Sequence, residues 1–354
     1  MNKHQSYDLK QMQSLPLEAK ILMTQRRIQQ WYDYWGGQVY VSFSGGKDST
    51  VLKHIVDNTP GVYDVPAVFV NTGLEYPEIQ KFAMSQPNVI TVRPEMRFDE
   101  VLKTYGYPVV SKEVSKRVSE YFNAREKGRL KQSLAFQEFN GLRKSQNGAS
   151  FYNKEKWSFL LLAPFNISNK CCDVMKKNPA KKYEKTTGRK AIIGTLAEES
   201  LARKKNWIQN GCNSFESVRP TSQPMSFWTE QDVLHYLQQY NIPYCSVYGD
   251  IVLRQVVDGD DVLEGQINLI DYLGCYEPED QLMTTGCDRT GCIFCMFGCH
   301  LEKGENRFQR LKKTHPRQYQ YCIGGGEMVD GMWEPNKEGL GLGYVLDYIG
   351  VDYE

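Results

Sequence analysis

Apolar runs of strand length alternate with stretches of helical periodicity through much of the chain. The apolar runs are residues 39–43, 65–70, 89–92 and 191–194. The helical stretches are residues 16–35, 48–57 and 76–85, and Thr229 with Asp232 is predicted to cap a further helix. Strands that alternate with helices are typical of βαβ units. The pattern predicts an α/β fold class with a doubly wound, mostly parallel sheet.

The chain of 354 residues is long enough for one large domain with an extension, or for two domains. We predict an N-terminal helical extension over residues 1–37 and an α/β domain over residues 38–245. The segment from about residue 111 to residue 160 interrupts the strand pattern and is predicted to be a basic helical insertion in that domain. Residues 246–354 are predicted to form a cysteine-rich C-terminal region.

The formal net charge of +1 conceals an uneven distribution of charge. Residues 111–160 contain eleven Lys or Arg and five Glu, and residues 178–190 add further basic side chains. Residues 250–280 and the tail from residue 327 are instead rich in acidic side chains. Solvated helix faces are the plainer explanation of the basic segment, and a surface that binds a polyanion is the alternative. The alternative would make a nucleic acid, tRNA or DNA, a possible partner through residues 111–190.

The apolar runs and the cysteines bear on the compartment. No run of about 18 apolar residues is present, and the polar N-terminal residues lack the apolar core of a signal peptide, so no membrane partner is expected. We predict a cytoplasmic protein, in which thiols stay reduced. All ten cysteines follow residue 170, and clustered thiols in that compartment more often bind metal or carry out redox chemistry than form structural disulfides.

A glycine-containing loop, SGGKDST at residues 44–50, joins the first predicted strand to the following helix. Adjacent glycines let the backbone approach a ligand closely, and the helix presents free N–H groups and the positive end of its dipole. Hydroxyl groups and the lysine ammonium add donors for phosphate oxygens. An ordinary βα turn is the alternative. The candidate ligands are Ser44, Gly45, Gly46, Lys47, Asp48, Ser49 and Thr50.

The loop sequence resembles the signature of PP-loop ATP pyrophosphatases, and later segments resemble the phosphoadenosine phosphosulfate (PAPS) reductase branch of that family. Those segments are residues 71–78, 171–179, 194–203 and 224–250, and the resemblance extends over roughly residues 38–300. It implies an adenine nucleotide alpha hydrolase-like fold. It also implies that the loop holds the β- and γ-phosphates of ATP while a substrate oxygen attacks the α-phosphate, so that AMP is attached to the substrate and pyrophosphate leaves.

The same resemblance implies further nucleotide contacts. These are Asn71, Thr72, Gly73 and Arg203. Leu196 stands where the branch usually has an arginine, and Arg203 is the residue that could compensate. PAPS and adenylylsulfate reductases lack the loop lysine, so Lys47 favours ATP itself. Lys47 and Asp48 are therefore candidate catalytic residues, with a Mg²⁺ ion bridging the phosphate oxygens.

Two cysteine pairs resemble those that ligate a [4Fe–4S] cluster in adenylylsulfate reductases. Adjacent cysteines are awkward ligands for one tetrahedral ion but can reach two irons, and a Cys-x-x-Cys turn brings two sulfurs to one centre. The implied metal ligands are Cys171, Cys172, Cys292 and Cys295. A rival set, closer together in the sequence, could bind zinc or an iron–sulfur cluster alone. It consists of Cys287, Cys292, Cys295 and Cys299.

The remaining cysteines divide into two kinds. With the first set as metal ligands, Cys287 and Cys299 become candidate catalytic thiols, as a persulfide carrier or a redox pair. His300, beside Cys299, is expected to pack rather than to activate the thiol. The others are predicted to be small buried hydrophobic residues. They are Cys212, Cys245, Cys275 and Cys322.

Three functions follow from these features. The first is an ATP-dependent enzyme that adenylates a substrate oxygen and then transfers sulfur with the help of an iron–sulfur cluster, zinc being the alternative metal. The second is a PAPS or adenylylsulfate reductase, in which a cysteine such as Cys299 attacks sulfur. The third is a nucleotide- or nucleic-acid-binding module without catalysis. Such a module would not need both an intact phosphate loop and this set of thiols. The sulfur donor, the acceptor and the oligomeric state stay open.

Overall fold

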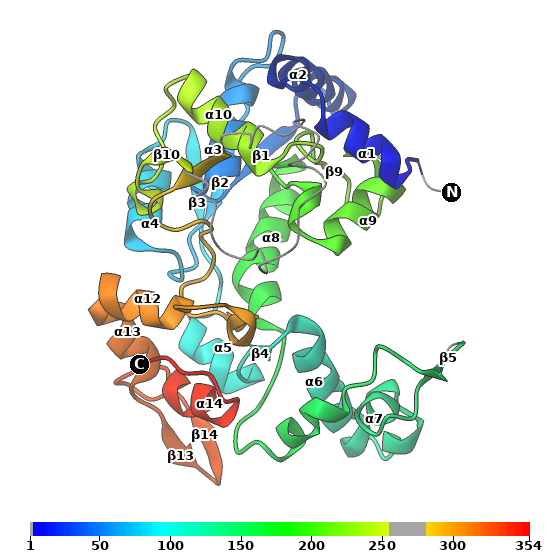
Figure 1. The fold of residues 1–354 in the computed structure, drawn as a ribbon, viewed down its shortest axis with the longest axis vertical. Coiled ribbons are helices and arrows are strands. Elements are labelled where there is room, and N and C mark those ends of the chain that lie inside the picture. Colours follow the sequence, from blue (N-terminus) through cyan, green and yellow to red (C-terminus); the bar gives the residue numbers. More distant parts are fainter. Residues whose placement is uncertain (1–2, 147, 255–280) are drawn as a thin grey trace, which may run out of the picture. The chain divides into compact units, whose positions relative to one another are not determined.

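The computed structural model describes residues 3–146, 148–254 and 281–354. The chain divides into two compact units, each assembled from three separate segments (Figure 1). The first unit consists of Met1–Phe69, Tyr76–Thr91 and Tyr183–Thr290, and the second of Val70–Glu75, Val92–Lys182 and Gly291–Glu354. The predicted regions 1–37, 38–245 and 246–354 are consecutive, whereas the two units alternate along the chain.

The first unit is an α/β domain. Its helices are α1 (Ser6–Gln13), α2 (Leu17–Tyr34), α3 (Lys47–Asp57), α4 (Pro77–Ser85), the C-terminal half of α8 (Asn178–Thr187), α9 (Leu201–Asn210) and α10 (Glu230–Gln239). Its strands are β1 (Val39–Phe43), β2 (Ala67–Val70), β3 (Val89–Val92), β7 (Lys190–Ile193), β8 (Asn213–Ser214), β9 (Thr221–Ser222), β10 (Ile251–Arg254) and β11 (Gln281–Thr284). None of the helices in the described ranges has an apolar stretch long enough to span a bilayer.

Six strands form the central sheet in the order β3-β2-β1-β7-β9-β8. β1 pairs in parallel with β2 and β7, β7 pairs in parallel with β9, and β8 pairs antiparallel with β9. The chain therefore continues from β1 to one side of the sheet through β2 and β3, and later returns to the other side at β7. Doubly wound sheets bind ligands at this switch point. The predicted α/β fold class with a mostly parallel sheet is confirmed.

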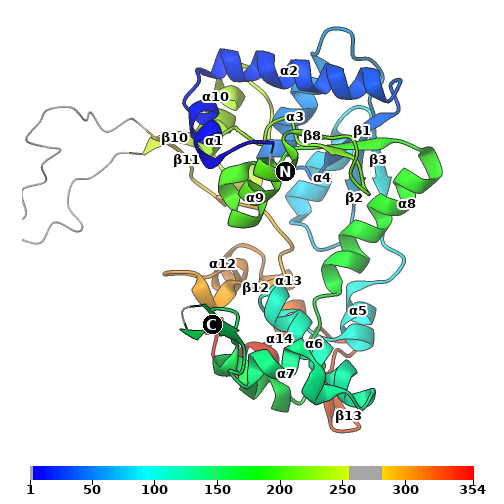
Figure 2. The ribbon, with the colours of Figure 1, turned by 90° about the vertical axis from the view of Figure 1, so that its right-hand side faces the viewer.

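Apolar side chains of the first helices and the sheet form the core of the first unit. Ile28 and Trp31 of α2 are fully buried, as are Val41 of β1 and Leu52 of α3. α2 packs on α3, which in turn packs on β1 and α10 (Figure 2). This packing holds the N-terminus of α3, and with it the glycine loop, against the sheet. The predicted cap of α10 is also present, since the Thr229 and Asp232 side chains each accept a hydrogen bond from the other's backbone N–H.

The second unit contains the basic insertion and the C-terminal segment. Its helices are α5 (Phe98–Tyr105), α6 (Lys112–Glu126), α7 (Leu134–Phe139), α12 (Arg307–Thr314), α13 (Pro316–Ile323) and α14 (Leu342–Tyr348). Its strands are β4 (Val109–Val110), β5 (Lys144–Ser145), β6 (Gly148–Ala149), β12 (Met296–Phe297), β13 (Glu327–Val329) and β14 (Met332–Glu334). The parallel pair β4–β12 joins the insertion to the C-terminal segment, with Val109 opposite Met296.

Candidate nucleotide and thiol sites

The glycine loop lies between β1 and α3, at the switch point of the sheet. Gly45 has a φ of +74°, and a Cβ there would lie 3.1 Å from Ile79 Cγ2. A Cβ on Gly46 would lie 3.1 Å from Tyr248 Oη. The first glycine is needed for its backbone conformation and the second for the close approach of Tyr248.

Hydroxyl groups stabilise the loop from within. Ser49 Oγ lies 3.0 Å from Ser44 Oγ and donates a hydrogen bond to the carbonyl oxygen of Gly46 (3.0 Å). Thr50 Oγ1 donates to the same carbonyl (2.9 Å). Five of the seven predicted loop ligands line the adjoining pocket: Ser44, Gly46, Lys47, Asp48 and Ser49. Gly45 and Thr50 instead contact the protein around the loop.

The loop borders a pocket of about 200 Å³ that lies wholly within the first unit. Lys47 is only 5% exposed, and its Nζ lies 2.9 Å from Glu230 Oε1 at the start of α10. The same ammonium lies 5.1 Å from the centre of the Tyr248 ring. Tyr248 Oη in turn lies 2.7 Å from Thr290 Oγ1. Lys47 is thus held over the pocket by a carboxylate and an aromatic ring.

Two arginines face the same pocket. Arg203, predicted to compensate for Leu196, lines the pocket beside it and is ion-paired with Glu199. Arg289 lies 3.0 Å from the other oxygen of Glu199. Burial, assisted by the neighbouring Arg289, lowers the pKa of Arg203. One carboxylate therefore pairs with two guanidinium groups that line the same cavity, and the sum of these three charges is positive.

Acidic groups share the pocket with these cations. Burial raises the pKa of Asp48, although Lys47 beside it favours the ionised form. Glu199, Glu230 and Asp288 are the other acidic residues of the lining, and the backbone N–H of Glu230 donates a hydrogen bond to Glu198 behind it at 2.6 Å. The pocket therefore combines cations that suit phosphate oxygens with carboxylates that suit a hard divalent cation.

The second predicted nucleotide loop belongs to the second unit. Thr72 donates through both its backbone N–H (3.1 Å) and its hydroxyl (2.7 Å) to the carboxylate of Glu75. The backbone N–H of Gly73 donates to Asn71 Oδ1 at 3.2 Å. These bonds fix the shape of the loop. A nucleotide contact through Asn71, Thr72 and Gly73 stays a prediction.

Four cysteines line one cavity within the second unit. They are Cys171, Cys172, Cys292 and Cys295. Leu74, Phe98, Pro108, Met175 and Phe294 supply apolar walls, and Lys176 adds a cation. The Cys-x-x-Cys segment forms a turn closed by a hydrogen bond from the Cys295 N–H to the Cys292 carbonyl (3.1 Å). The cavity thus unites cysteines that lie more than a hundred residues apart in the sequence.

The Cys171–Cys172 pair stands at the start of a long helical stretch. Their sulfur atoms are 3.9 Å apart, and a π-helical turn, Asp173–Lys177, follows before α8 continues. The hydrogen bond from Cys171, together with Lys112 and Lys176, lowers the pKa of Cys172 to about 6, although burial opposes its ionisation. Single π-helical turns are frequent at functional sites. Cys172 is therefore the thiol of this cavity that most readily becomes a thiolate.

The thiols around this cavity can be compared with the ligand sets that metals require. In the described part of the chain, no three His, Cys, Asp or Glu side chains are grouped so as to hold one ion. Four thiols around one largely apolar cavity nevertheless supply the soft donor set that iron–sulfur clusters require. Four thiolates are also the donor set of a zinc site, so the choice between an iron–sulfur cluster and zinc stays a prediction.

Comparison with protein families identifies the chain. The profile of the phosphoadenosine phosphosulfate reductase domain matches residues 38–159 and 108–296, which is well over half of the sequence. The chain belongs to the phosphoadenosine phosphosulfate reductase family. The predicted resemblance to the PAPS reductase branch of PP-loop proteins is thereby confirmed.

The sequence of this PAPS reductase family member is also similar to part of a known enzyme. It is 31% identical over 97 residues to an adenosine 5'-phosphosulfate reductase of Lysinibacillus sphaericus (strain C3-41). That alignment covers 27% of this chain and 37% of the relative, so it spans little more than a third of the relative's length.

Two solved structures resemble the PAPS reductase family chain more distantly. A phosphoadenylyl-sulfate reductase from Candida auris, in a phosphate complex, has 14% sequence identity and a TM-score of 0.34, with 66% of this chain and 91% of that chain covered. A Candida glabrata FMN adenylyltransferase in complex with ATP has 12% identity and a TM-score of 0.36, with 73% and 75% covered.

The other cysteines of this PAPS reductase family member are dispersed. Cys287 belongs to the first unit and is half-buried, whereas Cys299 belongs to the second and is only 2% exposed. Cys299 Sγ donates to the Met296 carbonyl at 3.0 Å, and burial raises its pKa to about 11. His300 packs against the Trp157 ring, as predicted.

The predicted core cysteines behave as expected. Cys212, Cys245 and Cys322 are buried, which confirms the prediction for these three. Cys275 lies outside the described residues.

Sequence reasoning assigned no role to several residues of the nucleotide pocket. Glu230 and Tyr248 come from elements about 200 residues after the loop, so no local pattern links them to it. Arg289 stands between Cys287 and Cys292. The spacing of these cysteines predicts a metal site and does not indicate a phosphate contact. The positive charge of Arg289 within a predicted metal-binding turn was the one sequence feature that could have indicated an anion site.

Proposed function

We propose that this member of the PAPS reductase family binds ATP in the loop pocket and adenylates a substrate oxygen with release of pyrophosphate. A sulfide-level sulfur from a donor then attacks the activated atom, the bond from that atom to the adenylated oxygen breaks, and AMP leaves with the oxygen. One observation carries the proposal: Lys47 is present in the loop, and its ammonium is directed over a pocket that also holds Arg203 and Arg289. Three cations converging on one cavity suit the triphosphate of ATP better than a nucleotide that ends without β- and γ-phosphates.

The pocket residues would act by exchanging partners. Without nucleotide, Lys47 pairs with Glu230, while Arg203 and Arg289 pair with Glu199. Phosphate oxygens would replace these carboxylates, and the cations would then stabilise the negative charge that develops on the departing pyrophosphate. The released carboxylates, with Asp48, are the oxygen ligands that Mg²⁺ prefers alongside phosphates.

In the second unit, Cys171, Cys172, Cys292 and Cys295 would hold a [4Fe–4S] cluster. The cluster, when bound, would supply a redox-active iron–sulfur group whose irons are all held by cysteine. The chain's own contribution is a set of four thiols in an apolar cavity, with Lys176 close enough to hydrogen-bond Cys292. This lysine would offset part of the negative charge of four thiolates.

Replacing Cys172 with serine is expected to remove most of the bound iron and acid-labile sulfide from protein purified without oxygen. Cys287→Ser serves as the matched control, because Cys287 is half-buried in the first unit and belongs only to the rival ligand set. It should retain the metal. Loss of iron in Cys287→Ser with retention in Cys172→Ser would contradict the assignment of the ligands. Zinc in place of iron would show that the four cysteines form a zinc site and not a cluster.

The reaction is tested by two assays on the same anaerobic preparation. We expect pyrophosphate release from ATP in the presence of Mg²⁺ and a sulfur acceptor mixture, and no release of sulfite from PAPS or adenylylsulfate. Sulfite release without ATP turnover would overturn the proposal in favour of a reductase.

A reductase of PAPS or adenylylsulfate is the second candidate. Family membership and the similarity to an adenosine 5'-phosphosulfate reductase favour it. Cys299 is a weak candidate for its nucleophile, since burial raises the thiol pKa to about 11 and the sulfur is hydrogen-bonded to Met296. Lys47 in the loop remains the observation that favours ATP over these nucleotides.

A further inference from the structure

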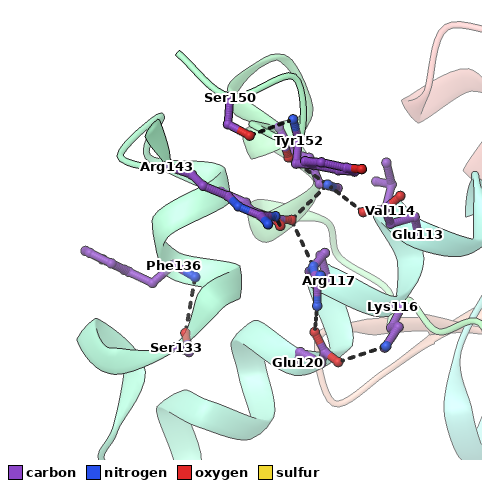
Figure 3. Close-up of polar contacts among 12 residues, drawn as sticks. Glu113, Val114, Lys116, Arg117, Glu120, Ser133, Phe136, Arg143, Ser150 and Tyr152 are labelled. Carbon is purple, nitrogen blue, oxygen red and sulfur yellow. Dashed lines mark hydrogen bonds and ion pairs between the residues drawn. The ribbon is translucent and has the colours of Figure 1, made fainter. Parts of the chain in front are cut away.

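The basic insertion contains a buried carboxylate at its centre. Glu138 of α7 is fully buried, and its carboxylate accepts hydrogen bonds from Arg117 Nε and Lys154 Nζ, both at 2.8 Å, and from Arg143 at 2.6 Å. Arg117 lies on α6, while Arg143 and Lys154 flank the β5–β6 hairpin (Figure 3). The network therefore ties the two helices and the hairpin of the insertion into one body.

The network is electrically neutral as a whole. Glu113 lies 3.1 Å from Lys154, and Glu120 pairs with Arg117 and, at 3.6 Å, with Lys116 (Figure 3). Three buried or half-buried cations are thus matched by the three carboxylates Glu113, Glu120 and Glu138. The excess positive charge of residues 111–160 must therefore reside on other side chains.

Those other side chains are exposed. Outside the network the segment has eight exposed cations and two exposed glutamates, Glu126 and Glu155, so its entire surplus of +6 faces solvent. The exposed cations are Lys112, Lys116, Arg125, Lys127, Arg129, Lys131, Lys144 and Lys156. Lys116 pairs with Glu120 and Lys112 acts on the Cys172 thiol, so the other six of these cations are the ones available to a polyanion.

Exposed aromatic rings accompany this charge. The Phe151 side chain is 97% exposed directly after the hairpin, and Tyr152 is 48% exposed. Arg143 lies 4.7 Å from the centre of the Tyr152 ring, and Lys156 Nζ lies 5.1 Å from the Trp157 ring. Exposing the ring of a phenylalanine to water costs free energy. A flat aromatic face in a basic segment is the feature on which unstacked nucleobases bind.

We propose that the insertion binds single-stranded nucleic acid, with Lys144 and Lys156 on its phosphates and Phe151 stacked on a base. Stacking requires bases that are accessible, which a duplex does not offer, so the surface favours single strands over duplexes. The further claim that the bound strand is the acceptor of the sulfur rests on the proposed function. Binding of the strand itself does not.

Fluorescence anisotropy of the full chain with labelled single-stranded DNA, single-stranded RNA and a duplex of the same sequence tests the proposal. We expect either single strand to bind more tightly than the duplex, and the stronger of the two identifies the natural class. Phe151→Ala should weaken binding about tenfold, whereas Tyr63→Ala, which removes a ring 70% exposed in the first unit, should not. Tighter binding of the duplex, absence of binding at low salt, or equal effects of the two substitutions would overturn the proposal.

Salt dependence provides an independent measurement. Replacing Lys144 and Lys156 together with alanine should make the plot of log affinity against log salt less steep by about 1.4, if each contacts one phosphate. The matched double variant Lys10→Ala, Lys81→Ala, exposed in the first unit, should leave the slope unchanged. Equal slopes for both double variants would contradict the phosphate contacts.

Failure of the proposed reaction with ATP can be distinguished from failure of the insertion to bind nucleic acid. Lys47→Ala should bind the single strand as the wild type does, because Lys47 belongs to the loop pocket of the first unit. Loss of strand binding in Lys47→Ala would show that the strand binds at the nucleotide pocket instead, and would overturn the assignment to the insertion.

Discussion

Replacing Lys47 with alanine is expected to lower ATP-dependent pyrophosphate release by about two to three orders of magnitude, the usual cost of removing one donor from developing negative charge. The ammonium is 5% exposed and fixed between Glu230 and the Tyr248 ring, so it is already positioned before nucleotide binds. A preorganised charge costs no rearrangement during the reaction, and no neighbouring lysine in the lining of the pocket can replace it.

The effect should be on turnover and not on folding. Glu230, the partner that Lys47→Ala leaves behind, is 41% exposed and can be hydrated, so the free energy of unfolding should change by no more than about 1 kcal/mol. Lys53→Ala is the matched control on the same helix, because Lys53 pairs with Asp57 and does not line the pocket. Full turnover in Lys47→Ala, or an equal loss of turnover in Lys53→Ala, would show that Lys47 has no specific role in the reaction.

Replacing Glu138 with alanine is expected to lower the free energy of unfolding by about 3–5 kcal/mol, because it leaves Arg117 and Lys154 without their buried partner. Urea denaturation monitored by tryptophan fluorescence measures the change. Glu126→Ala, exposed on α6, is the matched control and should stay within about 0.5 kcal/mol of the wild type. Similar midpoints for the two variants would show that the network contributes no stability.

The same network predicts a dependence on pH. Burial disfavours the charge on Glu138, but hydrogen bonds from Lys154 and Arg117 prevail and lower the pKa of its carboxyl from the ordinary value of 4.5. A lowered folded-state pKa gives stability that is complete above the unfolded-state value and is lost as pH falls through the folded-state value. The wild type should therefore lose stability in acid below about pH 4.5, and Glu138→Gln should lose less of it over the same range.

The local parts of the fold could be predicted from the sequence. Strand β1, helix α3 and the loop between them are encoded by adjacent residues, in which apolar periodicity, two glycines and a lysine act over a few positions. Glu138 also carried a readable signal, since it follows Ala135 by three residues on the apolar face of α7 and precedes the buried Phe139. A carboxylate in that position indicates a buried partner of opposite charge.

The remote parts could not be predicted in this way. Glu230 meets Lys47 across 183 positions, and Tyr248 reaches the loop across 201. Such contacts follow from the crossover of the chain between β1 and β7, which periodicity does not specify. The cysteine pairs were linked only by resemblance to a family, and the cavity they share provides the physical reason for that link.

The alternation of the two units along the chain has a consequence for biosynthesis. The cavity lined by Cys171 and Cys172 is closed by Cys292 and Cys295, and by the pairing of β12 with β4. A ribosome must therefore synthesise the chain as far as Cys295 before these four thiols can meet, because long-range contacts form only after both segments have emerged. Until then the first pair stays exposed to oxidants and free metal ions. Insertion of a cluster would thus be a late event, governed by completion of the chain and not by the early folding of the nucleotide loop.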